Sequence, residues 1–191
     1  MAYTERFERA LGFAAALHRT QVRKVSRVPY ISHLLAVAAL AIEAGATEDE
    51  AIAALLHDAV EDQGGMETYE AIFAEFGSHV AEIVAGCSDS VVDASKEAKK
   101  PWRERKETYI AHLKAASPSV RLVSCADKLH NARSLVRDLR RLGPSLWSHF
   151  NGGRDGTLWY YTELTKQYRD LGAPELLLVD LEEIVKEMQT F

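Results

Sequence analysis

The sequence predicts an all-α fold in which residues 1–191 form one domain of about eight or more helices. Apolar residues recur at intervals of three and four along most of the 191-residue chain, which is the spacing of an amphipathic helix. Capping residues precede several of these segments, and Gly or Pro follows them. No run of alternating polarity is strong enough to predict a sheet, and no internal repeat divides the chain.

Five helices are predicted in the N-terminal half. The first begins after its N-cap Thr4 and continues to about Thr20. A basic loop over 21–28 separates it from an almost wholly apolar helix that ends at Gly45. The next three are bounded by capping residues and glycines: one from the capping box of Thr47 and Glu50 to Gly64, one over 68–76 and one over 78–86.

The C-terminal half is predicted to begin with a loop, because the stretch 88–101 is polar and lacks periodicity. Helical spacing resumes over 102–116, and after Pro118 a long helix continues to Gly143. A short segment then reaches a glycine-rich loop over 151–156. Two further helices account for the remaining residues.

Composition places the chain among ordinary soluble domains, with 47% hydrophobic residues, 27% charged residues and a formal net charge of −5. The longest apolar run is nine residues, over 34–42, whereas a membrane-spanning helix needs ~20. The N-terminus lacks the pattern of a signal peptide. Cys87 and Cys125 are the only cysteines, too few for a disulfide framework or a cysteine-based metal site. We therefore expect a cytoplasmic protein.

Charge is unevenly distributed along the sequence. Between residues 28 and 95 there are thirteen Asp and Glu residues and no Lys or Arg, so this segment carries −13. All 23 basic residues lie outside it together with 15 acids, which gives the flanks +8. The separation is consistent with acids that face a metal and bases that face an anion, and ordinary exposed helix faces are the alternative.

The segment 55–62 carries the most informative group of ionisable residues. On a continuous helix His57 and Glu61 would share one face, and Asp58 and Asp62 the face about 100° further round. Such groups are costly to bury beside leucines unless they are paired or bound to a metal. An adjacent His and Asp offer one nitrogen and one oxygen ligand, which suits a divalent transition metal, and a solvated helix end is the alternative.

Two more candidate ligands lie in apolar surroundings elsewhere in the chain. His33 opens the apolar helix that follows Pro29, where a hydrogen-bonded core histidine is the alternative. Asp127 lies inside the long helix, where a carboxylate needs a partner. Asn131, one turn later, points the same way and can orient a water or a phosphate.

These residues resemble a known signature. His33, the pair His57–Asp58 and Asp127 are similar to the H…HD…D metal motif of HD-domain phosphohydrolases. With Arg23-Lys24, the segment 57–62 and the segment 127–131, the chain resembles more narrowly the hydrolase half of RelA/SpoT enzymes and the stand-alone small alarmone hydrolases, over about residues 6–172.

The resemblance implies a helical domain with one divalent metal, most often Mn²⁺. It implies hydrolysis of the 3′-pyrophosphate of guanosine tetra- or pentaphosphate, (p)ppGpp, to GDP or GTP and pyrophosphate. By the same resemblance the metal ligands are His33, His57, Asp58 and Asp127, the catalytic acidic pair is Glu61 and Asp62, and Asn131 positions the substrate or water. A carboxylate crowded by a second one has a raised pKa, as a general base requires.

Basic and aromatic residues are the candidates for binding the anionic nucleotide. Arg23 and Lys24 are the first choice. Further candidates are Lys128 beside a ligand, Arg103, Arg105 and Lys106 at the start of a helix, Arg154 in the glycine-rich loop, and Tyr160 as a stacking surface for a purine. The loop 151–156 lacks the spacing and the Lys of a P-loop.

Two departures from the family pattern bear on substrate choice. No Gly follows Arg23-Lys24, and Leu34 replaces a Pro that often follows the ligand histidine. The alternative activities are therefore those of other HD phosphohydrolases: adenosine alarmone hydrolase, NADPH 2′-phosphatase or nucleotidase.

Other classes of protein fit the sequence less well. A non-catalytic nucleotide sensor is expected to lose a ligand or an acid, and this chain retains them. Net negative charge without a basic stripe argues against nucleic-acid binding, and no membrane partner is expected. A nucleotide substrate is the expected partner, and the sequence leaves the oligomeric state open. The other histidines, at 18, 79, 112, 130 and 149, belong to no motif and are expected to be structural.

Overall fold

The computed structural model describes residues 3–88 and 100–191, and within these ranges the chain forms ten α-helices and one 3-10 helix. The predicted all-α class is therefore confirmed. The helices are α1 (Glu5–Leu17), α2 (Ile31–Glu43), α3 (Glu48–Leu56), α4 (Ala59–Asp62), α5 (Met66–Phe76), α6 (Ser78–Cys87), α7 (Trp102–Leu113), α8 (Pro118–Leu142), η1 (Pro144–His149), α9 (Gly153–Asp170) and α10 (Glu175–Met188).

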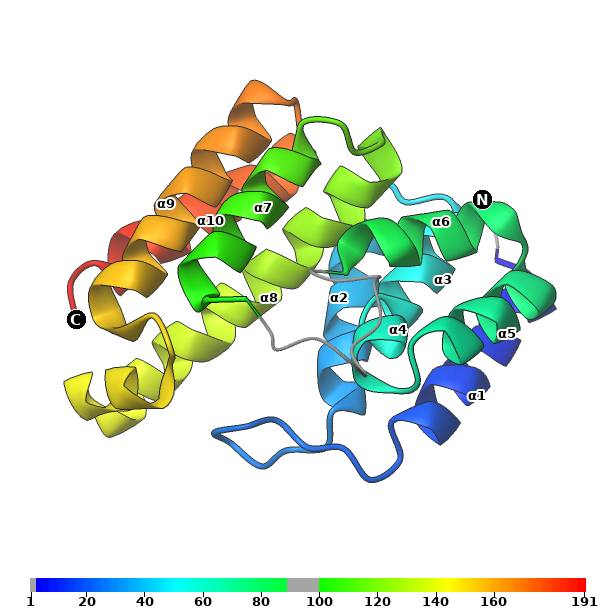
Figure 1. Ribbon diagram of the computed structural model, residues 1–191, viewed down its shortest axis with the longest axis horizontal. Coiled ribbons are helices and arrows are strands. Elements are labelled where there is room, and N and C mark those ends of the chain that lie inside the picture. The colour runs from blue at the N-terminus through cyan, green and yellow to red at the C-terminus, as the bar shows by residue number, and fades with distance from the viewer. Residues whose placement is uncertain (1–2, 89–99) are drawn as a thin grey trace.

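The long helix α8 is the centre of the fold. It crosses the molecule diagonally, with α1–α6 on one side and α7, α9 and α10 on the other (Figure 1). It packs against α2, α3 and α6 on the first side and against α10 on the second. Ser117 caps its start by accepting a hydrogen bond from the amide of Val120, and Gly143 ends it at a φ of 71°. Its arginines at 133, 137, 140 and 141 are exposed, whereas Asp127 is buried and must face another helix or an enclosed site.

The helices α2 and α3 form the apolar layer behind the candidate ligands. The predicted capping box is present: Thr47 accepts from the amide of Glu50 at 3.4 Å, and the Glu50 carboxylate accepts from the amide of Thr47 at 2.8 Å. Every residue from Ala51 to Leu56 is buried. Burial of these side chains fixes the end of α3 against α2 and α8.

One predicted helix is interrupted. The sequence pattern predicts a continuous helix from Thr47 to Gly64, but α3 ends at Leu56 and α4 begins at Ala59. His57 and Asp58 form a turn between the two, and Asp58 has a φ of −96° and a ψ of −4°. The prediction was wrong here because helical periodicity continues through the turn, with Ala59 and Val60 also buried.

Other helix ends differ from the predicted ones by a few residues. The first helix ends at Leu17 rather than at about Thr20, α7 ends at Leu113, and α9 already begins at Gly153 inside the predicted glycine-rich loop. Most of the predicted loop 88–101 lies outside the described residues. None of the described helices combines the length and the apolarity needed to span a membrane.

The basic loop between α1 and α2 is held by its backbone. An isolated antiparallel bridge pairs Val22 with Pro29, the amide of Arg23 donates to the carbonyl of Val28 at 2.8 Å, and the amide of Tyr30 donates to the carbonyl of Gln21 at 2.9 Å. These bonds close the loop into a hairpin, from which Lys24 reaches the last residue of η1.

Candidate metal centre and pocket

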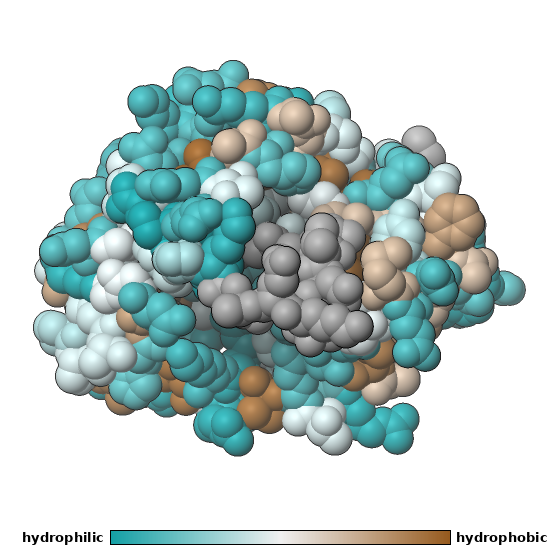
Figure 2. Space-filling model, viewed as in Figure 1, coloured by the Kyte–Doolittle hydropathy of each residue, from teal (hydrophilic) through white to brown (hydrophobic). Residues whose placement is uncertain are grey.

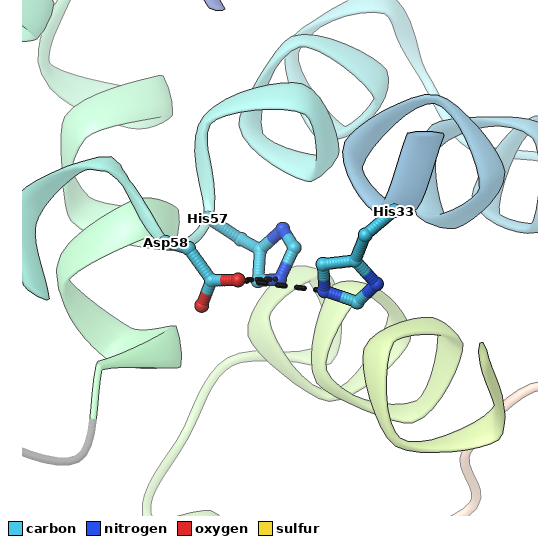
Figure 3. A group of neighbouring side chains, drawn as sticks. All are labelled: His33, His57 and Asp58. Carbon is cyan, nitrogen blue, oxygen red and sulfur yellow. Dashed lines mark ion pairs between the residues drawn. The ribbon is translucent and has the colours of Figure 1, made fainter. Parts of the chain in front are cut away.

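Four side chains from three parts of the fold meet at one point. His33 comes from the first turn of α2, His57 and Asp58 from the α3–α4 turn, and Asp127 from α8. The Oδ2 atom of Asp58 lies 3.0 Å from Nε2 of His57 and 3.4 Å from Nε2 of His33. The Oδ1 atom of Asp127 lies 3.2 Å and 3.5 Å from the Nε2 atoms of His33 and His57. Figure 3 shows the first three of these side chains pointing toward one another.

The donor set fits a divalent metal ion. The Nε2 atoms of His33 and His57 are buried, and neither has a hydrogen-bond partner in the part of the chain that the structure describes. The Nδ1 atom of His57 lies 2.9 Å from the carbonyl of Ala54, so Nδ1 donates there and Nε2 is the nitrogen that faces the carboxylates. Burial opposes protonation of His57, but Asp58 and Asp127 outweigh it and place its pKa well above the ordinary value, so the site favours a positive charge between the carboxylates, which a divalent ion supplies. The possible ligand atoms of His33, His57 and Asp58 lie within 4.8 Å of one another, and Asp127 lies beside them.

The carboxylates of the centre are held in their ionised form. Burial opposes ionisation of Asp127, but Lys128 and the two histidines outweigh it and place its pKa well below the ordinary value. Burial likewise opposes ionisation of Asp58, whose pKa is lowered by His57 and His33. Both side chains are therefore available as anionic ligands.

Neighbouring side chains orient the ligands. The hydroxyl of Tyr30 donates to Oδ2 of Asp58 at 2.6 Å. Asn131 donates to Oδ1 of Asp127 at 2.5 Å, and the Nζ of Lys128 lies 2.6 Å from Oδ2 of the same carboxylate. Such outer contacts fix the direction of a ligand and its basicity.

His130 contacts the centre although it was expected to be only structural. Its Nδ1 lies 2.6 Å from Nδ1 of His33, so one of the two rings donates to the other. Burial, followed by the positive charge of His33 and Arg23, lowers the pKa of His130 to about 4. A neutral His130 can accept the proton of His33 Nδ1 and leave Nε2 of His33 free for the metal. The signal was its position three residues after Asp127, which places both on one face of α8.

A pocket of about 500 Å³ adjoins the centre. Tyr30, Glu61, Lys128 and Asn131 line it on the side of the centre. The remaining wall is basic and aromatic and includes Arg23, Lys24, Arg105, Lys106, Arg137, Trp102, Tyr160 and Tyr161. The face in Figure 2 is mostly hydrophilic, with small scattered apolar patches. The excess of positive charge in the pocket suits an anionic ligand.

Most of the predicted substrate-binding residues reach this pocket. Arg23, Lys24, Lys106, Lys128 and Tyr160 line it. The guanidinium of Arg23 donates to Oδ1 of Asn131 at 2.7 Å, and Lys24 donates to the carbonyl of His149 at 2.8 Å. The hairpin loop is thereby connected to the metal centre on one side and to η1 on the other.

The structure does not bring Arg103 and Arg154 into the pocket. The guanidinium of Arg103 lies 3.2 Å from the ring centroid of Trp159 and also pairs with Glu107 at 2.8 Å. Arg154 contacts Asp155 at 3.5 Å and the carbonyl of Gln189 at 3.1 Å. On α7 the pocket is lined instead by Trp102, Arg105 and Lys106.

The two predicted catalytic acids point in different directions. Glu61 lines the pocket, whereas Asp62 is absent from its lining. The Oδ2 atom of Asp62 accepts from the side-chain amide of Gln21 at 2.7 Å, and Gln21 in turn accepts from Gln63 at 2.6 Å. Burial raises the pKa of Asp62. Glu61 therefore has direct access to a ligand, whereas the Asp62 carboxylate is engaged with Gln21.

Comparison with known proteins places the chain in a family. The model of the HD domain family matches residues 10–158. The guanosine-3′,5′-bis(diphosphate) 3′-pyrophosphohydrolases MESH1 of Xenopus tropicalis and Homo sapiens are each 39% identical over 142 residues, which are 73% of this chain and 72% of either relative. The Aquifex aeolicus enzyme named guanosine-3′,5′-bis(diphosphate) 3′-pyrophosphohydrolase is 37% identical over 136 residues, which are 70% of this chain and 18% of that protein.

Solved structures agree with the sequence relatives. A metazoan ortholog of SpoT, described as hydrolysing ppGpp and acting in starvation responses, superimposes with a TM-score of 0.77 and 32% identity over 98% of this chain and 97% of that one. A Listeria monocytogenes protein superimposes with a TM-score of 0.69 and 30% identity over 83% of this chain and 99% of that one. The chain therefore belongs to the HD-domain family and is a homologue of its MESH1 members.

Proposed function

We propose that this protein is a metal-dependent hydrolase that removes the 3′-pyrophosphate of (p)ppGpp and leaves GDP or GTP. The observation that carries the proposal is the meeting of two buried imidazole nitrogens and two carboxylates beside a basic pocket that also contains Glu61. The activity for which the MESH1 relatives are named, and the ppGpp hydrolysis described for the SpoT ortholog, support the same substrate. We further propose that residues 1–191 act as one domain and that the enzyme is cytoplasmic.

The metal is proposed to be Mn²⁺, held by His33, His57, Asp58 and Asp127. Nitrogen and oxygen ligands in this ratio suit a borderline divalent ion. A bound ion supplies Lewis acidity, which polarises a phosphoryl oxygen and makes water nucleophilic near neutral pH. Tyr30, His130, Asn131 and Lys128 keep the ligands in position.

Glu61 is proposed as the general base. It takes a proton from the attacking water, whose oxygen forms a bond to the phosphorus atom attached to the 3′ oxygen. The bond between that phosphorus and the 3′ oxygen breaks, the 3′ oxygen takes up a proton from solvent as pyrophosphate is released, and Glu61 returns its proton to solvent. Asp62, fixed by Gln21, adds negative charge behind Glu61 and favours its acceptance of the proton.

The basic wall is proposed to bind the phosphates and the aromatic wall the nucleoside. Arg23, Lys24, Lys106 and Lys128 bring positive charge to the pocket, and Tyr160 offers a ring to the purine. Arg23 also donates to Asn131, so substrate binding and the orientation of Asp127 share one hydrogen-bonded chain. Positioning and charge neutralisation supply most of the catalysis in phosphate chemistry.

A substrate panel with Mn²⁺ tests the proposal. It contains guanosine and adenosine 3′-pyrophosphates, NADPH and simple nucleoside monophosphates, with Asp127→Ala and Glu61→Gln proteins as controls. We expect release of pyrophosphate from the guanosine compounds, and loss of that release in both variants although their circular dichroism spectra stay helical. Cleavage of another phosphate ester without cleavage of any 3′-pyrophosphate would show that the substrate assignment is wrong.

A further inference from the structure

A second pocket of about 380 Å³ adjoins the first. The two pockets share Arg23, Ser26, Ser134, Arg137 and Asp138 in their linings, so they meet between the hairpin loop and the C-terminal half of α8. The proposed reaction uses only the first pocket. The second therefore needs its own explanation.

The described lining of the second pocket is predominantly positive. It contains the guanidinium groups of Arg23, Arg137 and Arg141 and a single carboxylate, that of Asp138. The Asp138 carboxylate faces Arg141 at 3.8 Å. Two positive charges remain after this pair, and Ser26, Ser32 and Ser134 line the same pocket. This combination of charge and donors suits an anion.

Arg137 differs from the other arginines of α8. Arg133 pairs with Asp180 and Arg140 pairs with Glu187, whereas Arg121 donates to the carbonyls of Ala116 and Leu171. Arg137 is exposed and has no hydrogen bond or ion pair with any residue that the structure describes. A guanidinium that is placed at the junction of two pockets and has no acceptor is ready to bind an anion in a bidentate manner.

Arg137 lies away from the metal centre, so an anion that binds to Arg137 is a different group from the anion at the metal. Arg137 follows Asp127 by ten residues on one continuous helix, which corresponds to about 15 Å along the axis. Arg23 lies between the two, because its guanidinium is bonded to Asn131 and also lines the second pocket. One molecule that reaches both ends must therefore carry anionic groups at both of its ends.

We propose that Arg137, together with Arg23 and Arg141, forms a second anion subsite that binds the 5′-phosphates of the nucleotide whose 3′-pyrophosphate lies at the metal centre. This inference rests on the proposed function. If the subsite binds these phosphates, substrate preference depends on the number of 5′-phosphates, and Arg137 is the residue that distinguishes them.

The test compares Arg137→Ala with Arg140→Ala, a matched control on the same helix whose guanidinium is paired with Glu187. For each protein, kcat/KM is measured with Mn²⁺ for guanosine 3′,5′-bis(diphosphate) and for guanosine 3′-diphosphate, which has a free 5′-hydroxyl. We expect Arg137→Ala to lower kcat/KM for the first compound by about tenfold, the loss of one charged hydrogen-bond pair, and to change the second by less than about twofold. Arg140→Ala should change neither.

Two results for Arg137→Ala would overturn the inference and leave the proposed function intact. One is an equal loss of kcat/KM for both compounds, and the other is no loss of kcat/KM for either. If the unmodified protein cleaves neither compound, the proposed function fails. Calorimetric titration with GDP then tests the subsite alone, because it needs no turnover. Binding that is about tenfold weaker in Arg137→Ala than in Arg140→Ala supports the subsite, and equal binding refutes it.

Discussion

His57 and Asp58 are adjacent in the chain, and their side chains meet: Nε2 of His57 lies 3.0 Å from Oδ2 of Asp58. On a continuous helix two successive side chains point about 100° apart. Here α3 has ended and α4 has not begun, so the turn brings both groups to the same point (Figure 3). The turn thus creates a two-ligand unit, and His33 and Asp127 complete it from α2 and α8.

The first prediction concerns removal of one ligand of this unit. Asp58→Ala should abolish the rise in Tm that Mn²⁺ causes in the unmodified protein. A metal raises Tm by binding to the folded state, and the variant lacks one of the ligands that bind it. Thermal unfolding with and without Mn²⁺ measures the effect. Asp155→Ala is the control, since that side chain is 96% exposed and far from the ligands in the sequence. A full Mn²⁺ response in Asp58→Ala would remove Asp58 from the ligand set.

The second prediction separates the two acids. Glu61→Gln should lower kcat by at least about 100-fold, because it removes the group that takes the proton, while Mn²⁺ affinity stays the same. Asp62→Asn should have a smaller effect, since the amide retains contact with Gln21 and only the charge behind Glu61 is lost. Steady-state kinetics and a metal titration on both variants check this. A larger loss of kcat in Asp62→Asn than in Glu61→Gln would reverse the assignment.

The third prediction concerns His130. His130→Phe should weaken Mn²⁺ binding by roughly 10–100-fold, because the ring of His33 loses the partner that orients it. His130→Gln keeps a hydrogen-bonding group and should recover part of the affinity. His112→Phe is the control, since the hydrogen bond of His112 among the described residues is to the carbonyl of Gly86 and involves none of the ligands. Equal metal affinity in the phenylalanine variant and the unmodified protein would show that His130 has no positioning role.

Local signals explain which parts of the fold could be predicted. The capping box of Thr47 and Glu50 and the end of α8 at Gly143 were predicted correctly, because each depends on residues within one turn. The break at His57 was not predicted, because it depends on how α3 and α4 pack against distant helices. Which side chains of α7 line the pocket was not predicted, for the same reason. Arg105 and Lys106 line it and Arg103 does not, because the packing of α7 on α9 sets the direction in which each side chain points.

In the candidate site, too, the features that depend on contacts between distant parts of the sequence could not be predicted. The candidate ligands were found from residue types and motif spacing, and the structure brings the four side chains together. His130 and Arg137 were missed, because each acquires its significance from a contact or an absent contact with residues far away in the sequence. Asp62 was expected to be coupled to Glu61; in the structure Glu61 lines the pocket, and the Asp62 carboxylate accepts from Gln21, 41 positions earlier.

The fourth prediction uses the two thiols. Burial raises the pKa of Cys125 to about 12, and burial also raises the pKa of Cys87 far above its ordinary value. Both thiols are therefore protonated and enclosed in the folded protein at pH 8, where a thiolate is the reactive form. A colorimetric thiol reagent should react with neither cysteine in the native protein and with both in denaturant. Rapid labelling of either thiol in the folded protein would contradict the packing around it.

The fifth prediction concerns the contact between Gly152 and Trp102 at the pocket wall. A Cβ atom at position 152 would lie 2.6 Å from Cη2 and 2.8 Å from Cζ2 of the Trp102 ring, which itself lines the pocket. Gly152→Ala must therefore displace the ring or the start of α9, at a cost of about 1–3 kcal/mol. We expect a lower Tm and a higher KM for the nucleotide with unchanged Mn²⁺ affinity, because the metal ligands lie on other elements. Gly12→Ala is the control: outside the adjoining residues and backbone of its own helix, no atom of the described chain lies within 4 Å of its new Cβ, and alanine favours the helix there by up to about 1 kcal/mol. A KM for Gly152→Ala equal to that of the unmodified protein would mean that the position of Trp102 does not matter for substrate binding.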